Sequence, residues 1–456
     1  ALAMSASDTS LQATDTICAI ATPPGVGGVG VIRVSGSISK TIAKQVLGVV
    51  PQARQAHFSK FRDGQGEAID SGIALLFIGP ASFTGEDVLE LQGHGGPQIL
   101  QMLMSRLMAL GARMARPGEF SERAFLNNKL DLVQAEAIAD LIESATEASA
   151  RAAQRSLEGV FSDAVNRLQQ ELIDLRVFVE AAMDFPDEEI DFLADSDVLD
   201  RLQGAGDHLR TLLDQAHQGQ LLRDGINIAI VGLPNAGKSS LMNALAGRDS
   251  AIVTDIPGTT RDVLREYISL DGLPVHVSDT AGIRESTDLV EVEGIRRARA
   301  TLATADLVLL VIDSLLGPDP HAALRAEVPD NIPCIEVHNK VDLIADEVSM
   351  DGEDQQVWIS AKTGKGINRL IALIKETVGA ATSNEGAFSA RTRHLDALQK
   401  TSDHIEAGRI RLEKFNEPET LAEELRLAQH SLGEITGEYL PDDLLGAIFS
   451  SFCIGK

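Results

Sequence analysis

The chain has 456 residues, 44% of them hydrophobic, which is enough for about two to four domains with cores of their own. Its formal charge of −27 argues against binding nucleic acid through an overall positive field, although a local basic patch remains compatible with it. Three scattered cysteines, Cys18, Cys334 and Cys453, exclude a disulfide framework or zinc cluster and predict a reducing cytoplasm, and no apolar run has membrane-spanning length.

The first part of the chain, residues 15–128, is predicted to be a small α/β unit. Apolar runs at 16–21 and 30–34 flank a turn rich in glycine and proline, which indicates two neighbouring strands. The glycines between them do not form a dinucleotide fingerprint, because a strand and not a helix follows them. The other expected elements are a helix at 38–47, strands at 73–78 and 88–92, and a helix at 98–110. His94 lies in a glycine turn, where a backbone-bonded turn histidine is more common than a catalytic one.

From residue 130 the hydrophobic period becomes helical. Apolar residues recur at spacings of four and three in two distant segments, which are Phe161, Val165, Leu168, Leu172, Leu175 and Val179, and then Leu421, Leu425, Ala428, Leu432 and Ile435. We expect one helical domain made of both segments, with two separate helical pieces as the alternative. The stretch 184–200 carries eight acidic residues and is predicted to be a solvated turn and not a metal site.

Residues 223–380 alternate strands and helices as in a doubly wound sheet. Residues 232–240 lie between an apolar strand and a predicted helix, where a phosphate loop must be. Backbone N–H groups at that helix start can surround a polyphosphate, Lys238 can reach its outer oxygens, and the Ser239 hydroxyl can coordinate Mg²⁺. This pattern predicts a nucleotide site.

Further motifs follow in the order that a GTPase requires. A hairpin, 267–277, delivers Asp279-Thr280-Ala281-Gly282, in which Asp279 can hold the water shell of magnesium and the Gly282 N–H can sense a γ-phosphate. Buried strands are expected at 308–312 and 332–337.

The base is predicted by Asn339-Lys340-Val341-Asp342, which follows the second of these strands. The Asp342 carboxylate can accept two hydrogen bonds from guanine but not from adenine. Ser360-Ala361-Lys362, after a short strand at 357–359, fits the loop whose N–H meets guanine O6. We therefore expect a GTP hydrolase, the alternative being a degenerate fold without hydrolysis. Ile283 follows Gly282 and cannot orient water, so another group must position the nucleophile and another charge must stabilise the transition state.

Several motifs together resemble one family. They are Asn235 in the phosphate loop, residues 254–262, the chain's end at 452–456, Thr22-Pro23-Pro24-Gly25, Ser82-Phe83-Thr84-Gly85-Glu86-Asp87, Arg116-Pro117-Gly118-Glu119-Phe120-Ser121 and Phe185-Pro186-Asp187-Glu188-Glu189. Over essentially its full length the sequence is similar to the MnmE (TrmE) family of bacterial tRNA-modification GTPases.

The resemblance implies that K⁺ replaces the missing arginine and that Glu291 orients the attacking water. Without the family, Glu291 would be one exposed acid at a charged helix start. The implied K⁺ ligands are Asn235, Thr254, Ile256 and Thr259, and the Mg²⁺ ligands are Ser239 and Thr260. The expected GTP contacts are Asn235, Ala236, Gly237, Lys238, Ser239, Ser240, Thr254, Asp255, Ile256, Pro257, Gly258, Thr259, Thr260, Asp279, Thr280, Ala281, Gly282, Asn339, Lys340, Asp342, Ser360, Ala361 and Lys362.

The resemblance also implies a tetrahydrofolate cofactor, in its 5-formyl or methylene form, bound near the interface of a homodimer that the N-terminal unit makes. The matching positions are Arg33, Glu90, Lys129 and Lys456, which on sequence alone are ordinary surface charges. Cys453 is four residues from the end, but a prenylation box does not suit Gly455 and Lys456. We expect Cys453 to be a catalytic thiol whose pKa is lowered by the Lys456 ammonium. The other expected catalytic residues are Lys238 and Glu291.

The expected fold class is therefore multidomain, α/β plus all-α. Its parts are a folate-binding-like dimerisation domain at 1–128, a discontinuous helical domain at 129–221 and 383–456, and an inserted Ras-like P-loop GTPase domain at 222–382. The family implies that a heterotetramer with the FAD-dependent partner MnmG (GidA) adds a carboxymethylaminomethyl or aminomethyl group at C5 of the wobble uridine, position 34, in certain tRNAs. The rival function is a stand-alone switch GTPase that assists ribosome assembly.

Overall fold

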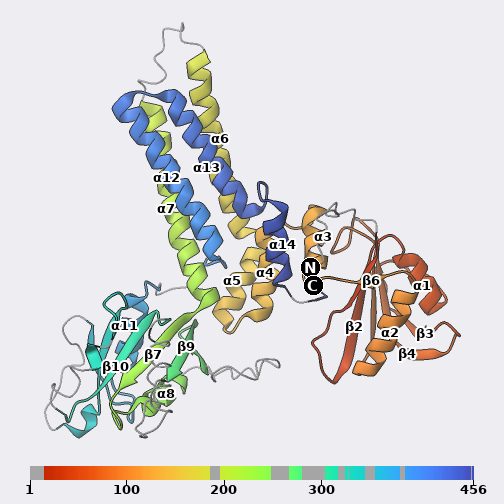
Figure 1. Cartoon of the computed structure of the whole chain (residues 1–456), viewed down its shortest axis with the longest axis horizontal. Helices are drawn as coiled ribbons and strands as arrows, with labels where there is room; N and C mark the ends of the chain where they lie inside the picture. The colour runs from red at the N-terminus through yellow and green to blue at the C-terminus, as the bar shows by residue number, and fades with distance from the viewer. Residues whose placement is uncertain are drawn as a thin grey trace, which may run out of the picture. The chain divides into compact units, whose positions relative to one another are not determined.

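The structure is a computed structural model in two compact units. It describes residues 15–184, 196–247, 266–279, 302, 304–316, 324–326, 328–344, 355–380, 386–452 and 454–455. Unit 1 comprises the described residues within 1–139 and 433–456, and unit 2 those within 140–432. Figure 1 shows both units and labels most of their helices and several of their strands.

Unit 1 contains a six-stranded sheet in the order β3-β4-β5-β2-β1-β6. Its strands are β1 (Ile17–Ile20), β2 (Gly27–Ser35), β3 (His57–Arg62), β4 (Ala68–Phe77), β5 (Val88–Gly95) and β6 (Arg113–Met114). Neighbouring strands are antiparallel except β1 and β6. Helices α1 (Ser39–Leu47) and α2 (Pro97–Ala109) pack on one face, against strand residues such as Ile32, Phe61 and Leu89.

The predicted set of strands for this unit was incomplete. It omitted the edge strand β3 and the short β6, and it began β4 too late, at residue 73. In β3 only Phe61 is buried, so the strand lacks the run of buried apolar residues that marks a strand in a sequence. An edge position therefore removes the signal on which such a prediction depends.

The C-terminal part of the chain returns to unit 1. Helix α14 (Asp442–Ser450) and Phe452 pack against α3 (Glu119–Leu126) and the start of α4 (Leu132–Glu143) through the rings of Phe125 and Phe449 and the side chain of Leu132. Gly118 must be glycine here, because its φ is +67° and an added Cβ would lie 2.4 Å from the Phe449 carbonyl oxygen.

Unit 2 contains a bundle of long helices (Figure 1). Its helices are α5 (Glu147–Leu157), α6 (Val160–Asp184), α7 (Ser196–Asp224), α12 (Thr392–Phe415) and α13 (Pro418–Thr436). Every residue of the two predicted seams is at most 2% exposed. Gln429 joins the distant segments, donating to the Leu172 carbonyl at 2.9 Å and accepting from Arg176 at 3.0 Å. The two distant segments predicted to be helical therefore pack into one bundle, while the domain bounds drawn from the sequence stay a prediction. No helix of the described residues is long and apolar enough to cross a membrane.

Unit 2 also contains the predicted doubly wound sheet, in the order β12-β11-β10-β7-β9-β8. Its strands are β7 (Ile226–Gly232), β8 (Glu266–Leu270), β9 (Leu273–Asp279), β10 (Leu307–Asp313), β11 (Cys334–Asn339) and β12 (Gln356–Trp358). All pairs are parallel except the β8–β9 hairpin. Residues of β7 alternate between two cores, and α8 (Lys238–Ala246) and α11 (Ile367–Thr377) supply the larger one.

One buried carboxylate holds the two ends of this inserted segment. Asp140, in α4, is 7% exposed. It accepts hydrogen bonds from Arg223 Nε at 2.8 Å, from Arg391 Nη2 at 2.7 Å and from Ser389 Oγ at 2.6 Å. Arg223 precedes β7 and the other two donors follow the exit from the sheet, so the helical host binds both points at once.

Candidate nucleotide site and N-terminal charge network

The phosphate loop lies between β7 and α8, where the sequence predicts it. Asn235 and Gly237 both have left-handed backbone, with φ of 65° and 96°. The Lys238 ammonium donates to the carbonyls of Gly232 at 2.7 Å and Leu233 at 3.1 Å, acceptors that phosphate oxygens can replace. The N-cap of α8 is Gly237, which has no side chain to accept from the first turn of the helix. The N–H groups at the helix start are therefore available to an anion.

The guanine motifs meet this loop through one amide side chain. Asn339 is 3% exposed, donates from Nδ2 to the Ala236 carbonyl at 2.9 Å, and accepts at Oδ1 from the Ala361 N–H at 3.0 Å. Ser360 Oγ donates to Asp342 Oδ1 at 2.7 Å. Segments more than 100 positions apart, 236 and 339, are thereby fixed to each other. An added Cβ at Gly237 would lie 2.2 Å from Asn339 Nδ2, so only glycine permits this approach.

The structure describes only some of the other residues predicted to bind GTP or a metal ion. Asn235, Ser239, Ser240 and Lys362 are exposed around the loop. Asp279 ends β9, but the structure does not describe its side chain. The predicted residues outside the described part of the chain are Thr254, Asp255, Ile256, Pro257, Gly258, Thr259, Thr260, Thr280, Ala281, Gly282, Glu291, Cys453 and Lys456, as is most of the acidic stretch 184–200.

Two of the predicted folate residues are partners on neighbouring strands of unit 1. Arg33 in β2 lies opposite Glu90 in β5, and its Nε and Nη2 lie 3.0 and 2.9 Å from Glu90 Oε1. The Arg33 guanidinium carbon is 5.5 Å from the ring centre of Phe83 and 5.8 Å from that of Phe120. Lys129 is exposed. Arg33 and Glu90 thus form a partly buried polar pair flanked by aromatic rings, not two isolated surface charges.

A buried charge network lies in the same unit and was not predicted as such. Arg123 is 5% exposed and bonds Glu86 and Glu119, each at 3.0 Å. Burial alone would raise the pKa of Glu119, but hydrogen bonds from Arg113, the Arg116 N–H and Arg123 outweigh it and hold this pKa below its usual value. The sequence signal was present, because the acidic Glu86 and Asp87 stand in one motif and Arg116 and Arg123 stand in or beside another.

His94 lies in strand β5 and is bonded to one acidic residue. Its backbone N–H donates to Asp70 Oδ2 at 2.8 Å, and its ring Nδ1 lies 2.7 Å from Asp70 Oδ1. Burial raises the pKa of Asp70, but the hydrogen bonds from His94 outweigh this and lower it. The prediction of a turn histidine was therefore wrong: His94 lies near the end of β5, and its ring is bonded to a carboxylate and not to the backbone.

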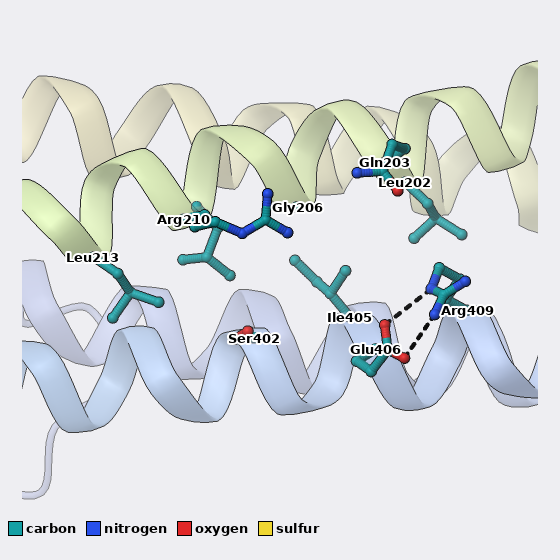
Figure 2. A pocket seen from close by; sticks show the side chains of 10 residues that line it. Leu202, Gln203, Gly206, Arg210, Leu213, Ser402, Ile405, Glu406 and Arg409 are labelled. Carbon is teal, nitrogen blue, oxygen red and sulfur yellow. Dashed lines mark hydrogen bonds and ion pairs between the residues drawn. The ribbon is translucent and has the colours of Figure 1, made fainter.

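A shallow hollow between α7 and α12 does not have the features of a ligand site (Figure 2). It has a volume of about 120 Å³ and lies over Gly206, whose missing side chain leaves open space. Arg409 at its rim is paired with Glu406 at 2.7 Å, and Arg210 with Asp207 at 2.7 Å. The arginines at the rim of the hollow are thus paired with carboxylates of their own helices.

Comparison with known proteins agrees with this geometry. A family model of the MnmE helical domain matches residues 132–453, and one described as the GTP-binding protein TrmE N-terminus matches 16–129. The chain is 54% identical over 446 residues to the tRNA modification GTPase MnmE of Hydrogenovibrio crunogenus, covering 97% of this chain and 99% of that one. The chain belongs to the MnmE (TrmE) family.

Other MnmE proteins are equally similar. That of Marinobacter nauticus is 54% identical over 453 residues and that of Methylococcus capsulatus 55% over 444, each covering 97% of this chain and 99% of its own length. Among solved structures, Aquifex aeolicus Era bound to GDP and AlF4⁻ is 26% identical over 39% of this chain and 66% of its own, with a TM-score of 0.28. That overlap is too low to support the fold, which rests on the strand order and the family models. The MnmE resemblance drawn from the motifs is confirmed.

Proposed function

We propose that this MnmE-family chain hydrolyses GTP, stimulated by K⁺, as part of the modification of C5 of the wobble uridine in certain tRNAs. The observation that supports it most directly is the Asn339 side chain, which joins the phosphate loop to the guanine motifs. A nucleotide bound there would have its phosphates at the start of α8 and its base beside Asp342.

Hydrolysis forms a bond from a water oxygen to the γ-phosphorus and breaks the bond to the bridging oxygen, giving GDP and phosphate. Lys238 would contact the outer phosphate oxygens, and Glu291 would orient the water. The exposed Ser239 hydroxyl and Asn235 amide are oxygen donors at the loop and fit Mg²⁺ and K⁺ respectively, with Thr254, Ile256, Thr259 and Thr260 completing the ligands. The bound cations would offset the charge that develops between the β- and γ-phosphates.

The K⁺ assignment is tested by the rate of GTP hydrolysis in KCl and NaCl at equal ionic strength. We expect turnover to be at least severalfold higher in K⁺, because the smaller Na⁺ fits the same oxygens poorly. Asn235→Ala should remove this preference while GDP still binds. Choline chloride gives the rate without an alkali ion. Equal rates in K⁺ and Na⁺ would refute the assignment.

For the one-carbon donor we propose a tetrahydrofolate, 5-formyl or methylene, at Arg33 and Glu90 with Lys129 and Lys456. Glu90 can accept from the pterin ring N–H and amine, and the basic groups can bind the glutamate carboxylates. Flanking Phe83 and Phe120 would exclude water from these bonds. Titration with 5-formyl-tetrahydrofolate should show weaker binding for Glu90→Gln, whereas Arg62→Ala, an exposed arginine on the same sheet, should bind normally. Unchanged affinity in Glu90→Gln would remove this site.

The sheet of unit 1 offers a surface for the proposed homodimer. On the face opposite α1 and α2, Phe58 and Ile73 are cross-strand neighbours that are 74% and 39% exposed, and Val29 is 63% exposed. Apolar groups gathered on one sheet face are typical of an interface. Phe58→Glu should therefore lower the mass measured by light scattering toward that of a monomer, and Lys44→Glu, an exposed position on α1 at the other face of the sheet, should not.

The proposed partners are MnmG (GidA), forming a heterotetramer, and tRNA, in the cytoplasm. Cys453 is proposed as a catalytic thiol of that complex. The test is to measure modified uridine at position 34 in tRNA from a strain that lacks this protein. Its loss, with recovery on adding the gene back, supports the modification function. Normal modification would favour the stand-alone switch GTPase that assists ribosome assembly.

A further inference from the structure

Asp313 lies at the carboxyl end of β10, directly beside Asn339 of β11 in the parallel register. It is 8% exposed. Its Oδ2 lies 2.6 Å from Lys340 Nζ, and its Oδ1 accepts from the Leu315 N–H at 3.1 Å. The same turn is bound a second time, because the Ser314 N–H donates to the Asn339 carbonyl at 3.1 Å. Asp313 therefore connects the end of one strand to the guanine motif that follows the next.

The backbone of Lys340 turns sharply at this point. Its φ and ψ are 70° and 30°, a left-handed conformation that L side chains rarely adopt. This residue turns the chain from β11 into the short 3₁₀ helix η1 (Val341–Leu343), which carries Asp342. The direction in which Asp342 points is therefore set by the turn at Lys340.

Three residues of the guanine motif are each held by a different partner. Asn339 is fixed through its own amide to the phosphate loop and to Ala361. Lys340 is fixed through its ammonium to Asp313, a buried carboxylate close enough for a charge-assisted bond. Asp342 is fixed by Ser360 on its other side.

We infer that Asp313 is a positioning residue for guanine recognition: it holds Lys340 and so fixes the turn that directs Asp342 at the base. This inference rests on the proposed GTP site. Asp313 does not touch the base itself, so its loss reduces selectivity without removing the groups that bind guanine.

The test compares GDP with IDP, using fluorescent derivatives of both and the full-length chain. Hypoxanthine lacks the exocyclic amine that Asp342 would accept from, so the ratio of the two affinities reports how well Asp342 is directed. In Asp313→Ala we expect GDP affinity to fall about tenfold and IDP affinity much less, because the lost bond to Lys340 releases the turn that directs Asp342 and so weakens the bond from Asp342 to the amine. Asp313→Asn keeps an acceptor for the Leu315 N–H, so its ratio of GDP to IDP affinity should lie between those of the wild type and Asp313→Ala.

The matched control is Asp306→Ala, at the other end of the same strand region. Asp306 also accepts from a neighbouring strand, from the Asn227 N–H at 2.8 Å and its Nδ2 at 3.1 Å, far from the nucleotide motifs. It should leave the GDP to IDP ratio unchanged. If Asp313→Ala keeps the wild-type ratio, or loses both nucleotides by the same factor, the inference is overturned.

Asp342→Ala distinguishes the inference from the site on which it rests. If this variant loses the preference for GDP and Asp313→Ala does not, the guanine site stands and the role of Asp313 is wrong. If Asp342→Ala itself keeps the preference, the proposed guanine site is wrong and the inference falls with it.

Discussion

Replacing Asp140 with alanine should destabilise the helical host strongly. The change removes a carboxylate whose side chain is 5% exposed and leaves the guanidiniums of Arg223 and Arg391 facing each other in a largely buried site. Breaking a buried ion pair from one side costs about 3–5 kcal/mol. Asp140→Asn keeps the shape and loses the charge assistance of two bonds, so we expect a smaller loss, about 2 kcal/mol. Both are large against a typical domain stability of about 5–15 kcal/mol.

Urea unfolding followed by two probes measures this effect. Far-UV circular dichroism reports mainly the helices, while the single tryptophan, Trp358 in β12, reports the inserted sheet by fluorescence. We expect the helical transition of Asp140→Ala to move to clearly lower urea. The control is Glu147→Ala, which breaks the exposed pair with Arg151 and should cost at most about 0.5 kcal/mol. If Asp140→Ala unfolds at the same urea concentration as this control, the carboxylate does not hold the insertion points.

Three other predictions follow from the same structure. Gly206→Ala should stabilise α7 by about 0.5–1 kcal/mol and raise the melting temperature, because the added Cβ has no atom within 4 Å; Figure 2 labels this position. Gly219→Ala in the same helix should lower the melting temperature, because its Cβ would lie 2.0 Å from the Phe388 carbonyl oxygen. The pKa of Glu119 is lower in the folded than in the unfolded protein, so its contribution to stability is complete above about pH 4.5 and is lost as the pH falls through the folded value. When unfolding is followed at decreasing pH, Glu119→Gln should therefore lose less stability below about pH 4.5 than the wild type does. Burial raises the pKa of Cys18 to about 11, so iodoacetamide at pH 8 should modify it only after unfolding, as peptide mass spectrometry can show, and labelling in the native protein would contradict this.

The parts of the fold that local patterns determine could be predicted from the sequence. The seam residues from Phe161 to Val179 repeat at helical spacing and are all buried, and the strands around the phosphate loop are marked by apolar runs. β3 could not be predicted, because an edge strand buries one residue and exposes its neighbours, including Phe58. Periodicity reports burial, so it fails where an element is regular but little buried.

The candidate site divides in the same way. Motifs of contiguous residues, such as the phosphate loop and Asn339-Lys340-Val341-Asp342, were predictable because each supplies its own chemistry. Asp140 and Asp313 were not, because each acts on residues distant in sequence: Asp140 on Arg391, and Asp313 on Lys340 in the turn after the neighbouring strand. A lone aspartate after an apolar segment looks like a solvated end until tertiary contacts give it partners.

The shared grip of Arg223 and Arg391 on one carboxylate has a consequence for how such a chain could arise and be re-engineered. Both points where the inserted segment meets the helices are bound to one carboxylate, and other contacts join the two parts, such as Thr146 Oγ1 donating to the Gly272 carbonyl at 2.9 Å. Exchanging the inserted segment within this helical bundle therefore requires a replacement that keeps two arginines bonded to Asp140 and an acceptor for the Thr146 hydroxyl.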